Sequence, residues 1–482
     1  MNDLPKLNIA RLNLPPVPDE KCVDDTLQKA FKNFHKKVIV LDDDPTGTQT
    51  VHDVPVYTNW SQKTLEDIME GPDNMAFILT NSRSFSQEQT TAVHKEIGRH
   101  LARAAKSSGK DFLLISRGDS TLRGHYPLET QVLKDELEKE THVRFDGEIL
   151  CPYFKEGGRV TIHNIHYVQE GDTLVPAGQT EFARDKTFGY TSSNLGEYVE
   201  EKSVGKISAS QCIFIPISML RQLDYTGITQ KLLSAGEFQK IIVNAQEDMD
   251  LKVFMICWLK AMAAGRHFLA RSAASLTRIA GNISPKPLLS REQLVSGQNG
   301  NGGLVIVGSH VQKTTLQLQQ LKAMEKPLCF LEFHADRCFQ ENGLDTEADR
   351  VLDLAQKAIA HGKTAVVYTS RQVITPDTGD KEQILGLSVR ISQALTSIVS
   401  RLTIQPGFIL AKGGITSSDV ATKGLGIKKA MVMGQIKKGI PVWMTGNEAK
   451  FPHMPYIIFP GNVGDENTLK EIVKILSNGS DR

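Results

Sequence analysis

The sequence predicts an α/β protein with two domains, each built on a mainly parallel sheet flanked by helices. Short, wholly apolar segments alternate with longer amphipathic ones along the chain, which is typical of parallel strands buried between two helical layers. The length of 482 residues exceeds what one hydrophobic core usually organises. A Gly/Asn-rich run at 296–303 separates two such series, so we expect the domains to join near residue 300.

Residues 37–290 are expected to form the first domain, after an N-terminal arm at 1–36 whose prolines favour an extended surface segment. Apolar runs predict its strands at 37–42, 54–57, 75–80, 111–116, 147–151, 212–216 and 240–244. Amphipathic spacing predicts its helices at 61–70, 86–108, 126–139, 226–235 and 249–264. Residues 152–206 are rich in Gly, Thr and charge, so we expect them to leave the sheet as an excursion with hairpins.

Residues 291–303 are expected to form a linker or loop, and residues 304–482 the second domain. The same patterns predict its strands at 304–308, 328–333, 364–369, 407–411, 429–433, 441–444 and 456–459. Its helices are predicted at 313–324, 346–361, 381–402, 416–423 and 465–477. We expect the active site in the cleft between the two domains.

Composition excludes several classes of protein. A net charge of +1 gives no electrostatic basis for binding nucleic acid or a membrane surface. No apolar run approaches the roughly 20 residues of a membrane helix, and the N-terminus lacks the pattern of a secretory signal. The six cysteines form no CxxC pair, which fits a reducing compartment. We therefore expect a cytoplasmic protein.

The end of the first predicted strand carries three consecutive carboxylates, Asp42 to Asp44, followed by a turn from Pro45 to Thr48. In open parallel sheets, ligands bind outside the carboxyl ends of the strands. Three adjacent acids repel one another, so a metal ion, a basic residue or a shared proton must offset their charge. This stretch is the first candidate site.

Two further strand ends in the first half carry polar and basic side chains. Arg83 follows the strand at 75–80, and a loop from Ser116 to Gly124 follows the strand at 111–116. That loop holds two guanidinium groups, a carboxylate and several hydroxyls. Arginine binds carboxylates and phosphates through two parallel hydrogen bonds, while Ser and Thr hydroxyls suit a polyol. These residues predict a small, oxygen-rich, anionic substrate, although a surface pair between Arg123 and Asp119 or Glu129 would explain one arginine without a ligand.

Three Gly-rich loops follow strands in the second half, at 308–315, 411–418 and 459–465. Glycines at such a turn let backbone N–H groups approach a phosphate, and a helix N-terminus adds a favourable dipole. Thr416 to Ser418 are also ordinary helix-capping residues, and neither a Walker A motif nor GxGxxG occurs. The three loops together still favour a nucleotide-binding domain.

As a set, these clusters resemble the four-carbon acid sugar kinase family, formerly a domain family of unknown function, over roughly residues 37–475. The family's DDxTG motif is similar to Asp43–Gly47, its STLRG motif to Ser120–Gly124, and its Gly-Arg pair to Gly158 and Arg159. Its three C-terminal motifs are similar to Gly308–Ser309 with Thr314 or Thr315, to Gly413–Thr416, and to Pro460–Gly464.

The resemblance implies an ATP-dependent kinase that phosphorylates a terminal hydroxyl of a tetronate-like sugar acid, with ATP and Mg²⁺ as cofactors and the metal ligands left open. The candidate catalytic residues are Asp43 and Asp44. The candidate substrate-binding residues are Thr46, Gly47, Arg83, Arg117, Ser120, Thr121, Arg123, Gly158 and Arg159. The candidate ATP-binding residues are Gly308, Ser309, Thr314, Gly413, Gly414, Ile415, Thr416, Gly461, Asn462 and Gly464.

The implied partners are a small-molecule sugar acid and a second copy of the chain in a homodimer, without nucleic acid or membrane. The chain departs from the family pattern at 187–207, at Asn244, where the family tends to have Asp, and at Ala273, where Gly is usual. These departures leave the identity of the acid open.

Two alternative functions remain at this stage. Asp42-x-Asp44-x-Thr46 also fits the DxDxT pattern of haloacid dehalogenase-like phosphatases, in which Asp42 would be the nucleophile. That interpretation lacks a convincing late acidic pair and leaves the second domain without a role. The other alternative is an acid-sugar-binding protein without turnover.

Overall fold

The chain folds into two compact units. The computed structural model describes residues 4–295, 300–309, 311–324, 328–370, 381–461 and 463–477. The first unit comprises residues 1–51 and 59–285, and the second comprises residues 52–58 and 286–482. The segment 52–58 therefore belongs to the second unit, although the sequence analysis assigned it to the first domain.

The first unit is built on a wholly parallel sheet. In spatial order its strands are β10 (Ile213–Ile215), β11 (Gln239–Val243), β6 (Gly147–Cys151), β12 (Phe268–Ser272), β5 (Phe112–Arg117), β2 (Lys37–Asp42) and β4 (Met75–Leu79). Every residue of β2, β4 and β6 is buried, which explains why their apolar residues follow one another instead of alternating with polar ones. The charged residues in these strands, Lys37, Asp42 and Glu148, are buried as well.

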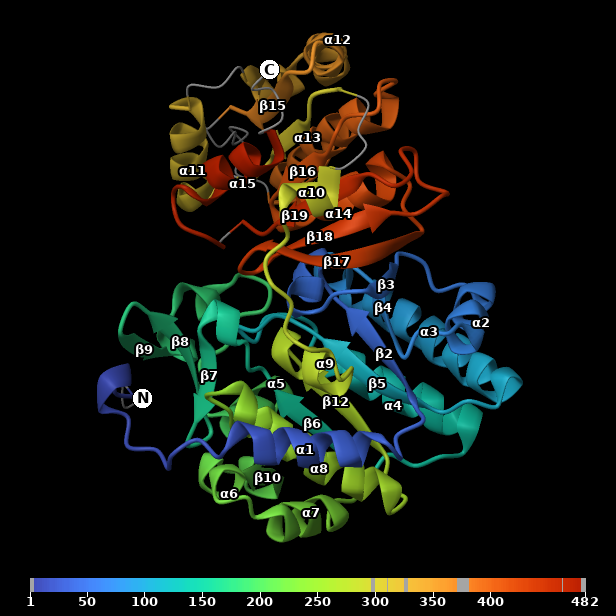
Figure 1. Cartoon of the computed structure of the whole chain (residues 1–482), viewed down its shortest axis with the longest axis vertical. Coiled ribbons are helices and arrows are strands. Elements are labelled where there is room, and N and C mark those ends of the chain that lie inside the picture. Colours follow the sequence, from blue (N-terminus) through green and yellow to red (C-terminus); the bar gives the residue numbers. More distant parts are fainter. Residues whose placement is uncertain are drawn as a thin grey trace. The chain divides into compact units, whose positions relative to one another are not determined.

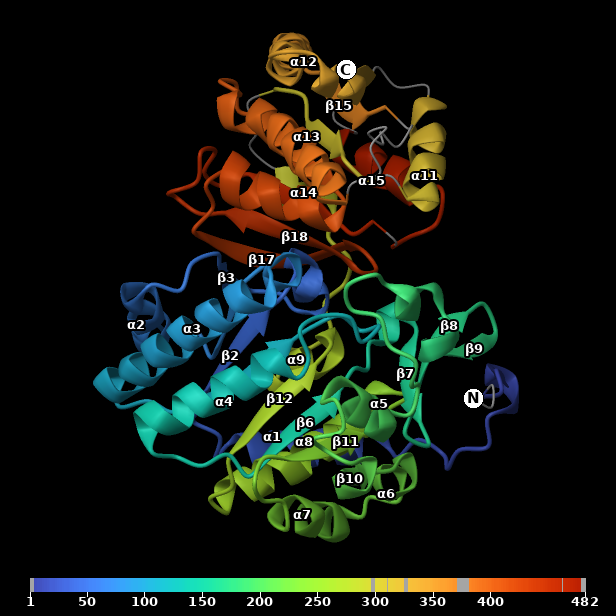
Figure 2. The ribbon, with the colours of Figure 1, turned by 180° about the vertical axis from the view of Figure 1, so that it is seen from behind.

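Helices cover both faces of this sheet (Figures 1 and 2). One face carries α1 (Glu20–Phe31), α6 (Ile217–Arg221), α7 (Tyr225–Leu233), α8 (Asp248–Ala263) and α9 (Ala274–Ala280). The other carries α2 (Gln62–Glu70), α3 (Gln87–Ser108), α4 (Leu128–Thr141) and α5 (Leu195–Lys202). Ser86 begins α3 with a capping box to Gln89, so this long helix starts where the sequence predicts.

The excursion after β6 forms a small antiparallel sheet. Its strands, in spatial order, are β1 (Leu7–Asn8), β9 (Thr173–Pro176), β8 (Ile165–Glu170) and β7 (Arg159–Ile162). A 3₁₀ turn at Glu181–Arg184 and helix α5 follow these strands. Tyr190, Leu195, Tyr198 and Val199 pack with Leu122 and Tyr126, so the excursion is anchored on the loop that follows β5.

The second unit has a mixed sheet. In spatial order its strands are β3 (Val54–Tyr57), β17 (Lys429–Lys437), β18 (Ile440–Thr445), β19 (Pro455–Phe459), β16 (Ile409–Lys412), β13 (Leu304–Val307), β15 (Thr364–Thr369) and β14 (Leu328–Phe333). The first three pairings are antiparallel and the remaining four parallel. The predicted α/β class with mainly parallel sheets is confirmed.

Helices also lie on both faces of this second sheet (Figures 1 and 2). One face carries α10 (Arg291–Val295), α11 (Gln312–Lys322) and α15 (Thr468–Ser477). The other carries α12 (Gly343–Ala360), α13 (Lys381–Arg401) and α14 (Gly414–Asp419). Within the described residues, Leu318, Leu321, Leu469 and Ile472 fill the core beneath α11 and α15.

Several elements were not expected from the sequence. The arm predicted for 1–36 contains helix α1, which Asp19 caps through the backbone N–H of Cys22, as well as strand β1. Strand β12 and helix α9 lie in a stretch with no predicted element. Helix α10 occupies 291–295 of the expected linker, while residues 296–299 lie outside the described residues. In β12, Arg271 interrupts the apolar run that would have indicated a strand.

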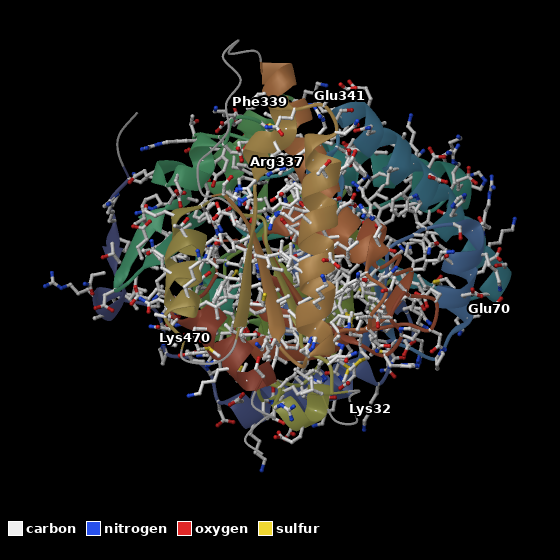
Figure 3. All side chains as sticks on the ribbon, turned by 90° about the horizontal axis from the view of Figure 1, so that it is seen from above. Lys32, Glu70, Arg337, Phe339, Glu341 and Lys470 are labelled. Atoms are coloured by element: carbon white, nitrogen blue, oxygen red, sulfur yellow. The ribbon has the colours of Figure 1, made fainter. Side chains whose placement is uncertain are left out.

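Large hydrophobic side chains on the surface are scattered. Phe339, labelled with Arg337 and Glu341 in Figure 3, ends a 3₁₀ turn (Ala335–Phe339) and is 63% exposed. Isolated exposed apolar residues are normal in globular proteins and do not by themselves indicate a binding surface. Among the described helices, none is long and apolar enough to cross a membrane.

Candidate functional site

The three consecutive aspartates lie at the carboxyl end of β2, in the interior of the first unit. Asp42 ends the strand, and Asp44 begins a 3₁₀ turn (Pro45–Thr50) by accepting a hydrogen bond from the Thr46 N–H at 2.8 Å. Asp42 is 1% exposed and Asp43 is 3% exposed. Buried carboxylates need partners, because desolvation otherwise makes the charged form unstable.

Arginines from the two neighbouring strand ends supply those partners. The Arg83 guanidinium binds both oxygens of Asp43, with Nη2 2.5 Å from Oδ1 and Nε 3.2 Å from Oδ2. Its Nη1 also lies 3.2 Å from Asp44 Oδ2. Arg117 Nη1 lies 3.1 Å from Asp42 Oδ1 and 3.9 Å from Asp43 Oδ1. Basic residues therefore offset the acidic cluster, which was one of the three possibilities open at the sequence level.

The three carboxyl groups differ in their pKa because their surroundings differ. Burial raises the pKa of Asp42 to about 7, against the opposing effect of Arg117. Burial also raises the pKa of Asp43, while Arg83 and Arg271 act in the opposite direction. For Asp44, burial is outweighed by Arg83 and the hydrogen bonds of Thr46, so its pKa falls. The cluster thus contains one carboxyl that can keep its proton near neutral pH.

The Asp42 pKa leads to a test of stability. A carboxyl whose pKa is higher in the folded than in the unfolded state favours folding below about pH 4, and this contribution is lost as pH rises towards 7. Asp42→Asn removes the titration. We therefore expect the free energy of unfolding of the variant, relative to that of wild type, to be higher at pH 7.5 than at pH 4.5. Urea unfolding of both proteins at the two pH values measures this gain. An equal difference at both values would contradict it.

Thr46 and Gly47 shape the turn that covers the aspartates. A Cβ atom on Gly47 would lie 1.9 Å from Asp42 Oδ2, so only glycine lets the turn approach this carboxylate. The Thr46 N–H binds Asp44 as described above. The structure thus gives both residues a local role in building the site, and their predicted contact with a substrate stays a prediction.

Arg271 on β12 is a member of this cluster that the sequence analysis missed. Its Nη1 donates to Ser116 Oγ at 2.9 Å and to Glu129 Oε2, and its Nη2 lies 3.9 Å from Asp43 Oδ2. A signal was present, because an arginine inside the apolar run Phe268–Ser272 must have a buried partner. Counting Arg271, three guanidiniums face four carboxylates in this interior.

The loop after β5 carries the predicted residues Ser120, Thr121 and Arg123. Arg123 Nε binds Asp119 Oδ2 at 2.6 Å, and its Nη1 lies 3.7 Å from Asp185 Oδ2. Asp119 also accepts a hydrogen bond from the Thr121 hydroxyl. The pair between Arg123 and Asp119, considered above as the alternative without a ligand, therefore forms, with both side chains largely buried instead of on the surface.

Three ring side chains of the excursion fix the backbone of this loop. His166 Nε2 donates to Ser120 O at 2.7 Å, Tyr190 OH to Thr121 O at 2.7 Å, and Tyr198 OH to Leu122 O at 2.8 Å. Burial lowers the pKa of His166 to about 4, so this imidazole stays neutral. The excursion thus holds the loop at consecutive carbonyl groups.

Gly158 and Arg159 lie beside this loop. The guanidinium carbons of Arg123 and Arg159 are 5.2 Å and 5.5 Å from the centre of the Phe182 ring. Arg159 Nη1 donates to Gly157 O, while its buried Nε has no hydrogen-bond partner within the described parts of the chain. Gly158 has φ of 70°, a conformation that favours glycine. Two arginines from separate elements thus converge on one aromatic ring.

In the second unit, the predicted Gly-rich loops leave three adjacent parallel strands, β13, β16 and β19. Their carboxyl ends therefore lie at one edge of the sheet. A Cβ atom on Gly308 would lie 2.3 Å from Thr416 Oγ1, and one on Gly461 would lie 3.2 Å from Ser309 Oγ. Thr314 Oγ1 lies within hydrogen-bonding distance of Ser309 Oγ, at 3.2 Å, and of Gly461 O, at 3.3 Å. The structure thus brings the three loops together.

The remaining predicted nucleotide-binding residues lie on the same loops. Gly413 has φ of 121°, a region open essentially to glycine, and precedes the N-terminus of α14. Gly414 begins that helix, and the Ile415 side chain is 67% exposed. Gly464 has φ of 80° and lies next to Thr468 at the start of α15. Asn462 lies outside the described residues.

Lys412, at the end of β16, was also missed by the sequence analysis. Its fully buried Nζ donates to Pro460 O at 2.6 Å and to Gly461 O at 3.2 Å. It also lies 3.7 Å from the centre of the Phe459 ring. Burial, with a smaller effect of Lys313, lowers the pKa of Lys412 to about 6. This lysine therefore ties the loop after β19 to the loop after β16.

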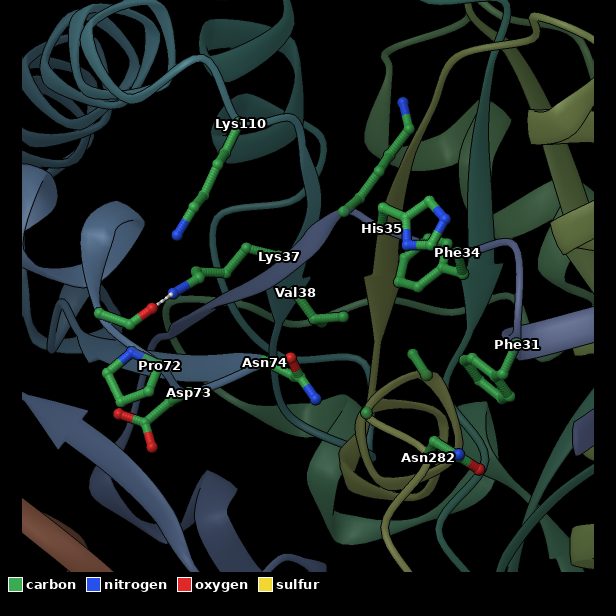
Figure 4. A pocket seen from close by; sticks show the side chains of 14 residues that line it. Phe31, Phe34, His35, Lys37, Val38, Pro72, Asp73, Asn74, Lys110 and Asn282 are labelled. Atoms are coloured by element: carbon green, nitrogen blue, oxygen red, sulfur yellow. Dashed lines mark hydrogen bonds between the residues drawn. The ribbon is translucent and has the colours of Figure 1, made fainter.

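A cavity of about 330 Å³ lies in the first unit at the amino ends of β2, β4 and β5, whereas the aspartates lie at the carboxyl end of β2 (Figure 4). Lys37 Nζ there donates to Ile68 O at 2.6 Å and to Gly71 O at 2.8 Å, and Lys110 Nζ donates to Glu70 O at 3.2 Å. These carbonyl groups end helix α2, so both lysines offset the negative end of that helix. Because their charges are already used in this way, the cavity is not the candidate site.

Fold and site together define a two-domain α/β protein with carboxylates and arginines in one unit and glycine-rich loops in the other. Residues 38–279 match the model of a sugar-binding N-terminal domain, and residues 304–469 match that of a nucleotide-binding C-terminal domain. The chain therefore belongs to the four-carbon acid sugar kinase family, which has this domain architecture.

Solved structures with the same fold have low sequence identity to the chain. A proposed tRNA synthase from Salmonella typhimurium LT2 is 15% identical with a TM-score of 0.63, over 90% of this chain and 98% of that one. A Haemophilus influenzae protein from a domain family of unknown function is 16% identical with a TM-score of 0.57, over 91% and 100%. No curated protein sequence matches the chain significantly. These similarities support the fold.

Proposed function

We propose that this protein transfers the γ-phosphoryl group of ATP to a terminal hydroxyl of a small, tetronate-like sugar acid. A sugar-binding and a nucleotide-binding domain in one chain support a kinase acting on a carbohydrate. The proposal that the substrate is an acid rests on the two guanidiniums at Phe182, which belong to Arg123 and Arg159.

Arg159 is the cation best suited to bind the substrate carboxylate. Arg83 and Arg117 are already paired with aspartates, and Arg123 is paired with Asp119 and Asp185. Burial lowers the pKa of Arg159, and the charge of Arg123 acts in the same direction. A carboxylate between the two guanidiniums would offset this repulsion through charge-assisted hydrogen bonds. The hydroxyls of Ser120 and Thr121 would then face the hydroxyl groups of the acid.

Asp43 and Asp44 are the proposed catalytic residues, since a carboxylate near the attacking hydroxyl can accept its proton. Backbone N–H groups of the loops at 308–309, 413–416 and 461–464 would bind the phosphates of ATP. Within the described ranges, no three Asp, Glu, His or Cys side chains are placed to hold a metal ion. We therefore assign Mg²⁺ to the nucleotide phosphates and derive no step through it.

The geometry weighs against the phosphatase alternative. That mechanism needs Asp42 to attack a phosphorus atom, but the backbone of the turn at Gly47 packs directly against this carboxylate, while Arg117 Nη1 lies 3.1 Å from its Oδ1. A nucleophile must contact its substrate, and this carboxylate is instead covered by the turn at Gly47.

An ATP-coupled screen tests the proposed function. The purified protein is incubated with ATP, Mg²⁺ and a panel of four- to six-carbon aldonic and oxo-acids, and ADP release is measured. We expect turnover with at least one four-carbon acid and none with the corresponding neutral sugars. Release of phosphate from sugar phosphates without use of ATP would instead support the phosphatase. Tight binding of an acid without any turnover would indicate a non-catalytic binding protein.

Arg159→Ala should weaken binding of the acid by about 10–100-fold, because losing a hydrogen bond to a charged group costs about 1.5–3 kcal/mol. Arg123→Ala should act in the same direction. Nucleotide binding should not change in either variant. Calorimetry with each ligand measures both effects. Arg184→Ala, which removes an exposed arginine from the same excursion, is the matched control, and an equal loss in that variant would contradict the assignment.

A further inference from the structure

We infer that Arg271 and Glu129 act as a pair that positions Asp43 and sets its charge, with Arg271 favouring the carboxylate and Glu129 opposing it. Neither residue is a motif position of the family resemblance. The inference builds on the proposed function, in which Asp43 is catalytic, but it concerns a property of Asp43 that can be measured without turnover.

Two buried partners hold Arg271 at one nitrogen of its guanidinium. Its Nη1 donates to Glu129 Oε2 and to Ser116 Oγ. Glu129 in turn accepts a hydrogen bond from Ser82 Oγ at 2.6 Å. Glu129 and Arg271 are both buried, so water does not screen their interaction. Four elements thus fix the guanidinium: β12, α4, β5 and the turn after β4.

The outer edge of the same guanidinium faces Asp43, with Nη2 3.9 Å from Oδ2. This distance is longer than a hydrogen bond, yet it is short for two opposite charges in a buried site. Because Glu129 holds Arg271 at Nη1, it keeps the cation from moving closer to Asp43. The positive charge of Arg271 therefore attracts the Asp43 carboxylate. Glu129 weakens this attraction, because it fixes the distance of Arg271 and adds a negative charge of its own.

Arg271 also supports the loop that carries Ser120 and Thr121. A Cβ atom on Gly118 would lie 2.1 Å from Arg271 Nη2, and one on Gly124 would lie 2.9 Å from the same atom. Both glycines thus leave room for the guanidinium under the loop. Arg271 thus lies next to the acidic cluster and next to both ends of this loop.

Charged side chains from several elements surround Asp43. Arg83, Arg117 and Arg271 favour its ionised form, whereas Glu129 and the neighbouring Asp42 and Asp44 oppose it. His94 Nε2 lies 3.8 Å from Glu129 Oε1, and burial lowers the pKa of this histidine. Removing Arg271 and removing the charge of Glu129 should therefore shift the pKa of Asp43 in opposite directions.

The test measures the Asp43 pKa by NMR of ¹³C-labelled aspartate carboxyl groups, with the Asp43 signal assigned through Asp43→Asn. The measurement is made in an Asp42→Asn background, so that the neighbouring titration near pH 7 does not interfere. We expect Arg271→Gln to raise the pKa by about one unit or more and Glu129→Gln to lower it by a similar amount. Arg271→Lys, which keeps the positive charge, should leave the pKa of Asp43 close to its value with Arg271 in place.

Arg221→Gln is the matched control, because Arg221 is a buried arginine of the same unit that pairs with Asp250 and does not face Asp43. It should leave the Asp43 pKa unchanged. If an acid substrate is found, the acid limb of the kcat profile should follow the same opposite shifts. Shifts in the same direction, or none, in folded variants would overturn the inference.

If Arg271→Gln does not fold, the other two variants still test the inference. Glu129→Gln should lower the pKa of Asp43, and Arg271→Lys should leave it close to the wild-type value. Failure of the ATP-coupled screen would count against the proposed function alone, because the NMR measurement needs no turnover.

Discussion

Asp43→Asn is expected to lower kcat by about 10²–10⁴-fold, the usual loss when a catalytic base is removed. Asparagine has the same shape but cannot accept the proton of the attacking hydroxyl. Arg83 binds both oxygens of Asp43, so the substitution keeps one acceptor in place and should leave the fold intact. Initial rates with the best acid from the screen, together with melting temperatures, measure the effect.

The matched controls are the two neighbouring aspartates. Asp44→Asn is expected to be impaired as well, whereas Asp42→Asn should keep substantial activity because Arg117 and the turn at Gly47 enclose that carboxylate. Asp42 also lies outside the family's paired acids. An inactive Asp42→Asn beside an active Asp43→Asn would overturn the kinase assignment of this loop.

Gly414→Val is expected to weaken ATP binding by about 100-fold while leaving acid binding unchanged. Gly414 is the first residue of α14, directly after Gly413, where backbone N–H groups can approach a phosphate. A valine side chain at this position would block that approach and remove charge-assisted hydrogen bonds, each of which is worth about 1.5–3 kcal/mol. Calorimetry with ATP and with the acid measures the two affinities separately.

Ala360→Val provides the control for this second prediction. It places the same side chain at the exposed end of α12, in the same unit but away from the Gly-rich loops. ATP binding should be unaffected. Loss of both ligands in Gly414→Val would point to misfolding or to a different arrangement of the two sites.

Strands β2, β4, β13 and β16, which lead into candidate site residues, were predictable because the local sequence of each indicates a buried strand. Residues 38–41 and 75–79 are continuous apolar runs. The three aspartates follow the first run directly, and Arg83 lies four residues after the second. Likewise, the runs at 304–307 and 409–412 pass straight into glycines that start helical turns. In these places hydrophobic pattern and turn chemistry agree, so the sequence predicts both the element and the polar residues at its end.

Elements that lack such a local signal were missed. Strand β12 contains Arg271, whose charge breaks the apolar run, and helix α9 has only seven residues. The pairing of β3 with β17 joins residues more than 370 positions apart, so no periodicity around residue 54 could assign that segment to the second unit. Long-range pairing of this kind depends on the whole sheet.

The sequence by itself determined which carboxylates, arginines and glycines follow the predicted strands, and so which residues are candidates for the site. Only the tertiary structure decided how those residues are paired. Because β12 lies between β5 and β6, Arg271 reaches Asp43 and Glu129. Arg83 and Arg117 bind aspartates, whereas Arg159 forms no ion pair within the described residues and its buried Nε has no hydrogen-bond partner there. The physical reason is that charged groups pair over distances of a few ångströms. The partners lie on strands that are distant in the sequence, so local sequence patterns do not reveal the pairs.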